Sequence, residues 1–129
     1  MADELLFYCE TRDIIVIESY IKSLSDLKND TITILIKKDG LYFIDIATVF
    51  YSSHFDNYFC NKQVQIEVEL SSFLNAIKTV NDQTVLSIFI KNRNITKLRI
   101  LQQKGGNIQR DIITIKNKLL SNKKRSIEN

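Results

Sequence analysis

Proline is absent from this sequence, and glycine occurs only three times in 129 residues. These two residues are the strongest breakers of helices and strands, so element ends are weakly marked and few devices protect exposed sheet edges. Long apolar runs are also absent, since none approaches the roughly 20 residues of a membrane-spanning helix. We therefore expect no membrane-embedded helix. The first residues, MADELLFYCETRD, are acidic where an export signal carries positive charge, so we expect no export signal either.

Residues that carry catalysis or bind metals are scarce. The chain has two cysteines, Cys9 and Cys60, and one histidine, His54. Two thiols without export are typical of free cysteines in a reducing compartment such as the cytosol or nucleus, and with one histidine they are too few for a zinc site. No nucleophile accompanies His54, and KGGN at Gly105 and Gly106 is typical of a turn rather than a phosphate-binding loop. The sequence predicts no enzyme, no metal and no cofactor.

The net charge of +3 is concentrated at the end of the chain. Lys123, Lys124 and Arg125 against Glu128 contribute +2 of it. The remaining body is close to neutral, whereas a tight, charge-driven nucleic-acid binder carries a dense basic face. Short basic ends are more often disordered than functional, although a nuclear address or a DNA-touching arm stays open. We expect one domain over residues 1–120 and a disordered basic tail over residues 121–129.

The first half of the chain predicts a strand, a helix and further strands. LLFYCE is typical of a short strand, and TRDIIVIESYIKSLSDL has apolar residues at helical spacing behind a Thr11 or Asp13 cap. TITILIKK alternates as a strand does, and Asp39-Gly40 supplies the turn of a tight hairpin that returns through LYFIDI. An apolar loop then leads to another strand, FDNYFC.

The same order recurs in the second half. VQIEVEL predicts a strand, SSFLNAIKTV a short helix with Phe73, Ile77 and Val80 inward, TVLSIFI and KLRILQQ a hairpin, and IQRDIITIK a closing strand. The chain thus contains two β-α-β-β-β repeats. Their apolar faces are covered if the halves pair into one layer of antiparallel sheet with both helices on one side. This arrangement is a two-layer α+β fold.

Alternation in VQIEVEL distinguishes two faces of the sheet. The inward set is Val64, Ile66, Val68 and Leu70, and the outward set is Gln65, Glu67 and Glu69. This pattern is typical of an antiparallel sheet with one wet face, which we expect to be somewhat acidic. The closing strand IQRDIITIK has apolar residues on both faces, so it is a candidate edge for pairing with another chain.

The ordered set of these elements resembles a known family. Two β-α-β-β-β repeats, GLYFIDI behind its turn, FDNYFC, and VQIEVELSSFLNAIKTV together resemble the first, N-terminal domain of a eukaryotic or viral-type DNA sliding clamp, the proliferating cell nuclear antigen family. The sharpest element is the spacing of Phe55, Tyr58 and Cys60, followed by a strand, Leu70, Ser71 and a helix. The resemblance covers about residues 5–120.

The resemblance implies a ring of six such domains around duplex DNA, with helices lining the hole and sheets forming the outer wall. Such a clamp is a processivity factor in the nucleus, or at a cytoplasmic replication site if viral. Its implied partners are DNA polymerase, other replication and repair proteins with peptide motifs, and a clamp loader. The implied DNA-facing residues are Arg12, Lys22, Lys28 and Lys78. A clamp must slide, so a thin basic lining is compatible with this role; the alternative is that these are merely solvated helix faces.

The resemblance also gives the apolar loop a role. The loop after GLYFIDI would wall a pocket for partner peptides, formed by Ile46, Val49, Phe50 and Tyr51. The alternative is that it tucks back over the sheet. The sequence departs from the family at Ile46-Ala47-Thr48, where an acidic residue is common. If the pocket is real, Val49→Asp with Phe50→Ser should abolish docking and leave the fold intact.

The subunit contact implied by the resemblance pairs the edge strand over residues 108–116 with a second clamp domain. Its residues here are Ile108, Arg110, Ile112, Ile113 and Ile115. This sequence contains no second domain. It is therefore interpreted as the first domain of a longer clamp, as a single-domain clamp that assembles with itself or a partner chain, or as a clamp-derived protein-interaction adaptor that does not close a ring on DNA.

Overall fold

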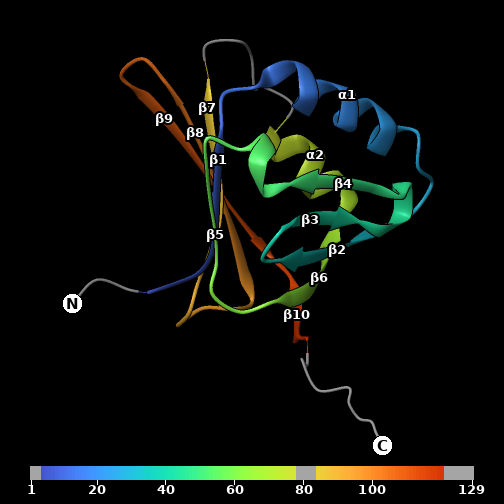
Figure 1. The fold of residues 1–129 in the computed structure, drawn as a ribbon. Coiled ribbons are helices and arrows are strands. Elements are labelled where there is room, and N and C mark those ends of the chain that lie inside the picture. Colours follow the sequence, from blue (N-terminus) through green and yellow to red (C-terminus); the bar gives the residue numbers. More distant parts are fainter. Residues whose placement is uncertain (1–3, 78–83, 121–129) are drawn as a thin grey trace, which may run out of the picture.

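The computed structural model describes residues 4–77 and 84–120 (Figure 1). Lys78, Val80 and the basic tail over residues 121–129 lie outside the described residues.

The elements in chain order are β1 (Leu5–Thr11), α1 (Ile14–Ser25), β2 (Thr31–Lys37), β3 (Gly40–Phe43), η1 (Ile44–Ile46), β4 (Thr48–Tyr51), η2 (Ser52–His54), β5 (Asn57–Cys60), β6 (Val64–Glu69), α2 (Leu70–Ile77), β7 (Val85–Lys91), β8 (Lys97–Lys104), β9 (Asn107–Thr114) and β10 (Lys116–Leu119). Neither α-helix of this part of the chain has the length and hydropathy to span a membrane.

The strands form two five-stranded antiparallel sheets that share the two repeats. Sheet A has the order β5-β1-β7-β8-β9, and sheet B has the order β10-β6-β2-β3-β4. Each repeat gives its three middle strands to one sheet and its first and last strands to the other. The α+β class and the repeated β-α-β-β-β order are confirmed, with one further strand in each repeat: β4 in the first and β10 in the second. The expectation of a single sheet layer is wrong, because the strands divide between two sheets.

Both helices lie in the angle between the sheets. Figure 1 shows α1 and α2 side by side on the inner side of sheet A and above sheet B, and the two helices contact each other. Leu24 of α1 and Phe73 of α2 are buried in the same core as Phe43 of β3. Removal of such side chains from water is the main favourable term in folding. The core therefore joins both sheets and both helices.

Strand β6 shows the expected alternation. Val64, Ile66 and Val68 are buried, and Glu69 is exposed. The outer face of sheet B is not simply acidic, however, because β10 pairs beside β6 and places Lys116 opposite Glu67. The closing strand of the first repeat, FDNYFC, is β5, and it pairs with β1 as an edge of sheet A.

Gly40 allows β4 to lie against β3. The residue begins β3 after the Asp39 turn, pairs with Tyr51, and has φ of +157°. A Cβ atom at this position would overlap the Phe50 carbonyl oxygen and lie 2.8 Å from Tyr51 Cα. Both neighbours are backbone atoms, so they cannot move without displacing the strand. Glycine is therefore required here for close approach of two strands as well as for its backbone angle.

Gly40→Ala should lower the free energy of unfolding by about 3 kcal/mol, because it adds both backbone strain and a clash with β4. The matched control is Gly106→Ala, since a Cβ there meets nothing within 4 Å. Urea unfolding followed by circular dichroism measures both. Equal stability of the two variants would contradict the close packing of β3 and β4.

Candidate partner and nucleic-acid surfaces

The apolar segment expected to be a loop is strand β4. It runs antiparallel to β3, with Val49 opposite Tyr42 and Phe50 opposite Leu41. A 3-10 turn over Ile44–Ile46 and a left-handed residue, Ala47 with φ of 50°, separate the two strands. Successive side chains of a strand point to opposite faces. Val49 and Tyr51 therefore lie on the outer face of sheet B, whereas Phe50 points inward.

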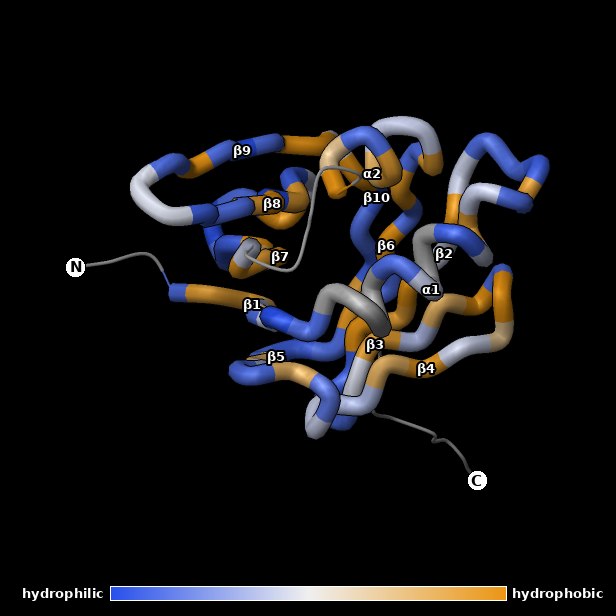
Figure 2. The backbone as a smooth tube through the Cα atoms, turned by 90° about the horizontal axis from the view of Figure 1, so that it is seen from above, coloured by the Kyte–Doolittle hydropathy of each residue, from blue (hydrophilic) through white to orange (hydrophobic). Residues whose placement is uncertain are grey.

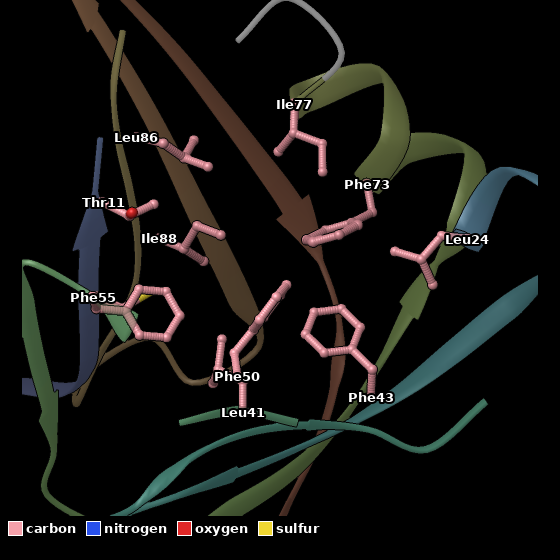
Figure 3. A pocket seen from close by; sticks show the side chains of 11 residues that line it. Thr11, Leu24, Leu41, Phe43, Phe50, Phe55, Phe73, Ile77, Leu86 and Ile88 are labelled. Carbon is pink, nitrogen blue, oxygen red and sulfur yellow. The ribbon is translucent and has the colours of Figure 1, made fainter. Parts of the chain in front are cut away.

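Phe50 belongs to the core and cannot wall a surface pocket. It is 9% exposed, and its ring lies 5.3 Å from that of Phe43 and 6.1 Å from that of Phe55, centroid to centroid. Figure 3 shows it among side chains from both sheets and both helices, around a cavity of about 40 Å³. Ile46 is half-buried and packs against the same core. The expectation that Phe50→Ser leaves the fold intact is wrong, because that change removes a core ring.

Sequence reasoning missed Tyr42 as a neighbour of Val49 and Tyr51. The outer patch of sheet B consists of Leu35, Tyr42, Val49 and Tyr51. Two contacts hold the Tyr42 ring in place. Its hydroxyl donates to Asp39 Oδ2 at 2.8 Å, and Lys37 Nζ lies 4.8 Å from the ring centroid. The hydrogen bond to Asp39 raises the pKa of Tyr42. The Asp39-Gly40 turn sets the register of β2 and β3, and that register is the signal that would have predicted the position of Tyr42.

The cations expected to face DNA are spread along and beyond α1. Arg12 precedes the helix, Lys22 is in its last turn, and Lys28 follows it; all three are exposed. A helix of 12 residues is about 18 Å long, so the first and last of these cations are far apart. Glu18 is exposed on the same helix. The described part of this surface is thus weakly basic, and Lys78 lies outside it.

Strand β9 is an edge of sheet A, but only part of the expected interface strand is exposed. Ile108 is 44% and Ile112 57% exposed, and Arg110 lies on the same face of the strand. Ile113 faces the core at 8% exposure. Ile115 is also buried, and it lies after the end of β9, where the chain crosses from sheet A to sheet B. The strand over residues 108–116 is therefore two strands, β9 and β10, and Ile113 and Ile115 stabilise the core.

A polar groove of about 530 Å³ lies between α2 and β9. Its lining includes Glu69, Ser72, Asn75 and Asp111, and the Ser72 hydroxyl donates to the Glu69 carboxylate. The groove adjoins the exposed edge of β9, so a strand added to that edge would approach two carboxylates. The sequence pattern did not indicate this groove, because its two walls come from non-adjacent segments of the chain.

The residues considered for catalysis or metal binding are His54, Cys9 and Cys60. His54 is exposed and its ring contact is Tyr51, at 6.0 Å between centroids. Cys9 is fully buried, and burial raises the pKa of its thiol. Cys60 is half-buried, and burial raises its pKa to about 11. Within residues 4–77 and 84–120, no three His, Cys, Asp or Glu side chains are grouped so that they could hold a metal ion.

Comparisons with known proteins identify the fold. No protein-family model matches the chain, and no curated protein sequence matches it significantly. Among solved structures, it is similar to the crystal structure of PCNA from Thermococcus kodakaraensis, with a TM-score of 0.71 and 16% sequence identity. The match covers 95% of this chain and 50% of that chain. The protein therefore has a PCNA-like clamp fold and spans about half the length of that protein.

Phe50→Ala should lower the free energy of unfolding by about 4 kcal/mol, because it leaves a cavity among aromatic rings. Tyr51→Ala, one residue later on the outer face, should cost less than about 1 kcal/mol. Urea unfolding of the two variants measures the contrast. Similar losses at both positions would mean that β4 is not oriented as described.

Both thiols should resist alkylation in the folded protein at pH 8, because the raised pKa of each leaves little thiolate. The free energy of unfolding should also fall above about pH 8.5, where an unfolded cysteine ionises and the folded Cys60, with a pKa of about 11, does not. Mass spectrometry after iodoacetamide treatment, with and without urea, checks the first result. Fast native labelling of Cys60 would contradict it.

Proposed function

We propose that this chain is a DNA sliding-clamp domain that acts without catalysis as a processivity factor, tethering DNA polymerase and other replication or repair proteins to duplex DNA. The observation that carries the proposal is the fold: two interlocked repeats bring both helices together and leave β9 at the edge of sheet A. A ring needs both features, since helices face the hole and sheet edges join neighbouring domains. Its place of action would be the nucleus or a cytoplasmic replication site.

Ring closure requires further copies of this chain or a second clamp domain. Strands β4 and β9 occupy corresponding ends of sheets B and A. Pairing of β9 of one copy with β4 of the next would be head-to-tail, and such contacts form a ring when their rotation closes. Figure 2 shows hydrophobic stretches on both of these edge strands. Apolar edge strands favour pairing with a neighbour.

The polar groove between α2 and β9 also constrains which surface of a neighbouring copy can lie against it. Glu69 and Asp111 lie beside the β9 edge, so the adjoining surface would bring a cation to this position. Peptide-motif partners and a clamp loader would use other surfaces, and the outer patch of Tyr42, Val49 and Tyr51 is the exposed apolar candidate on sheet B.

The second candidate function is a clamp-derived protein-interaction adaptor that does not close a ring. The specific observation in its favour is the weak charge of the α1 surface, where Arg12, Lys22 and Lys28 are far apart and Glu18 intervenes. Contacts to duplex DNA depend on phosphate neutralisation, so few cations give weak binding. Sliding tolerates weak binding only when a closed ring holds the DNA. Assembly state is thus the property that separates the two functions.

Sedimentation equilibrium over a range of concentrations at moderate salt should show a closed oligomer, about 90 kDa for six copies of 15.0 kDa. Ile108→Asp with Ile112→Asp should dissociate it, because charges at the β9 edge oppose pairing. A monomer at every concentration would contradict self-assembly into a ring.

The matched control is Leu119→Asp, an equally exposed apolar residue on β10. It should leave the oligomer unchanged, because β10 is not one of the proposed pairing edges. Dissociation by the control variant would place the contact elsewhere. Circular dichroism of all variants separates lost assembly from lost folding.

A further inference from the structure

The outer face of sheet A carries a row of aromatic side chains that the proposed clamp function does not use. The register places Phe59 of β5 opposite Tyr8 of β1, Tyr8 opposite Phe89 of β7, and Phe89 opposite Arg99 of β8. Paired residues of adjacent strands share a face. This face is the outer one, because the alternate residues Cys9 and Ile88 line the internal cavity.

The row is ordered, with Phe59 exposed and Tyr8 and Phe89 half-buried. Phe59 is 48% exposed, and the Tyr8 and Phe89 rings lie 6.1 Å apart at 36° to each other. The Tyr8 hydroxyl donates to Glu10 Oε1 at 2.8 Å, which fixes the ring. Neighbouring strands are about 4.8 Å apart, so the four side chains span about 14 Å. Both helices lie on the opposite, inner face of sheet A (Figure 1).

Cations outnumber acids on this face. The register directs Lys91, Lys97, Arg99 and Arg110 outward, and Glu10 is the carboxylate within the paired strands of the same face. Glu10 already accepts the hydrogen bond from Tyr8. The Arg99 Nε atom is buried and has no hydrogen-bond partner among the described residues. Arg99 as a whole is only half-buried, so an anionic ligand would meet the remainder of its guanidinium group, and charge-assisted hydrogen bonds to such a group are strong.

We propose that the outer face of sheet A binds single-stranded nucleic acid. Bases stack on aromatic side chains and guanidinium planes, and an antiparallel sheet face with such side chains holds two or three bases. The stacking surface consists of Phe59, Tyr8 and Phe89, and Arg99 supplies the guanidinium beside it. Lys97 and Arg110 would contact the sugar-phosphate backbone of the nucleic acid. The phosphates complement the excess positive charge of the face.

This site differs from the helix surface proposed to face duplex DNA. The cations Arg12, Lys22 and Lys28 lie on and around α1, where the described residues offer no aromatic row. The aromatic row on β5, β1 and β7 lies across the core from the helices and is separated from the β9 edge by β8, so it stays accessible whether or not a ring forms. Failure of assembly would therefore leave this proposal standing, and failure of single-strand binding would leave the clamp proposal standing.

Fluorescence anisotropy with a labelled ten-nucleotide oligothymidylate tests the site. The full chain should bind saturably, and the logarithm of the association constant should fall with the logarithm of salt concentration at a slope of about −2 for three cations. Phe59→Ala and Arg99→Gln should each weaken binding about tenfold, through lost stacking and lost charge. Arg110→Gln should make this slope shallower by about 0.7, because one phosphate contact is lost.

Tyr51→Ala and Lys22→Gln are matched controls, because they remove an exposed aromatic ring and an exposed cation from other surfaces. Both should bind oligothymidylate as the unaltered chain does, and thermal melting should confirm that all five binding and control variants are folded. Absence of saturable binding at low salt would overturn the proposal. Loss of binding in Lys22→Gln with retention in Phe59→Ala would also overturn it, by assigning the nucleic acid to the helix surface.

Discussion

The exchange of strands between the two repeats is the constraint on which the rest of the structure depends. The hairpin strands β2, β3 and β4 gain their sheet neighbours β6 and β10 from the second repeat, and β7, β8 and β9 gain β1 and β5 from the first. Neither repeat can bury its apolar face alone. These pairings join distant parts of the chain, so the entropy of loop closure precedes most of the stabilising contacts. The domain therefore folds as one cooperative unit.

Strand exchange also determines which edges stay open. With β1 and β6 built into the opposite sheets, the ends of the two middle hairpins, β4 and β9, remain as corresponding free edges. β4 is held against its sheet by the close approach at Gly40, and β9 continues directly into β10. Neither edge carries a proline, which natural proteins use to block pairing. The interface proposed at these edges would thus follow from the topology combined with the amino-acid composition.

Local patterns in the sequence predicted the elements but not their grouping. Strict alternation identified β6, and the Asp39-Gly40 turn identified the β2–β3 hairpin, because both signals are contained in a few neighbouring residues.

Strand β4 was missed because its turn uses Ala47 in a left-handed conformation, where glycine or asparagine would have marked it. A loop at these residues implies no alternation of side chains, so the sequence pattern does not assign Phe50 and Tyr51 to opposite faces. The break at Ile115 was missed for the same reason, since no glycine or proline marks it. The partition into two sheets depends on pairings between distant segments, which a local pattern does not contain.

The distribution of charge is more informative than its total. A net charge of +3 with a basic tail gave little reason to expect nucleic-acid contact from the body of the chain. The register nevertheless gathers four cations on the outer face of sheet A beside three aromatic rings, whereas the cations around α1 are scattered. Charge alone attracts phosphate without fixing it, which suits the proposal that duplex DNA slides past the α1 surface. Charge combined with stacking surfaces favours unpaired bases, because a duplex keeps its bases stacked on one another. The two proposed sites on one domain would therefore take two different forms of nucleic acid, and the difference would arise from where the aromatic residues lie in the sheet.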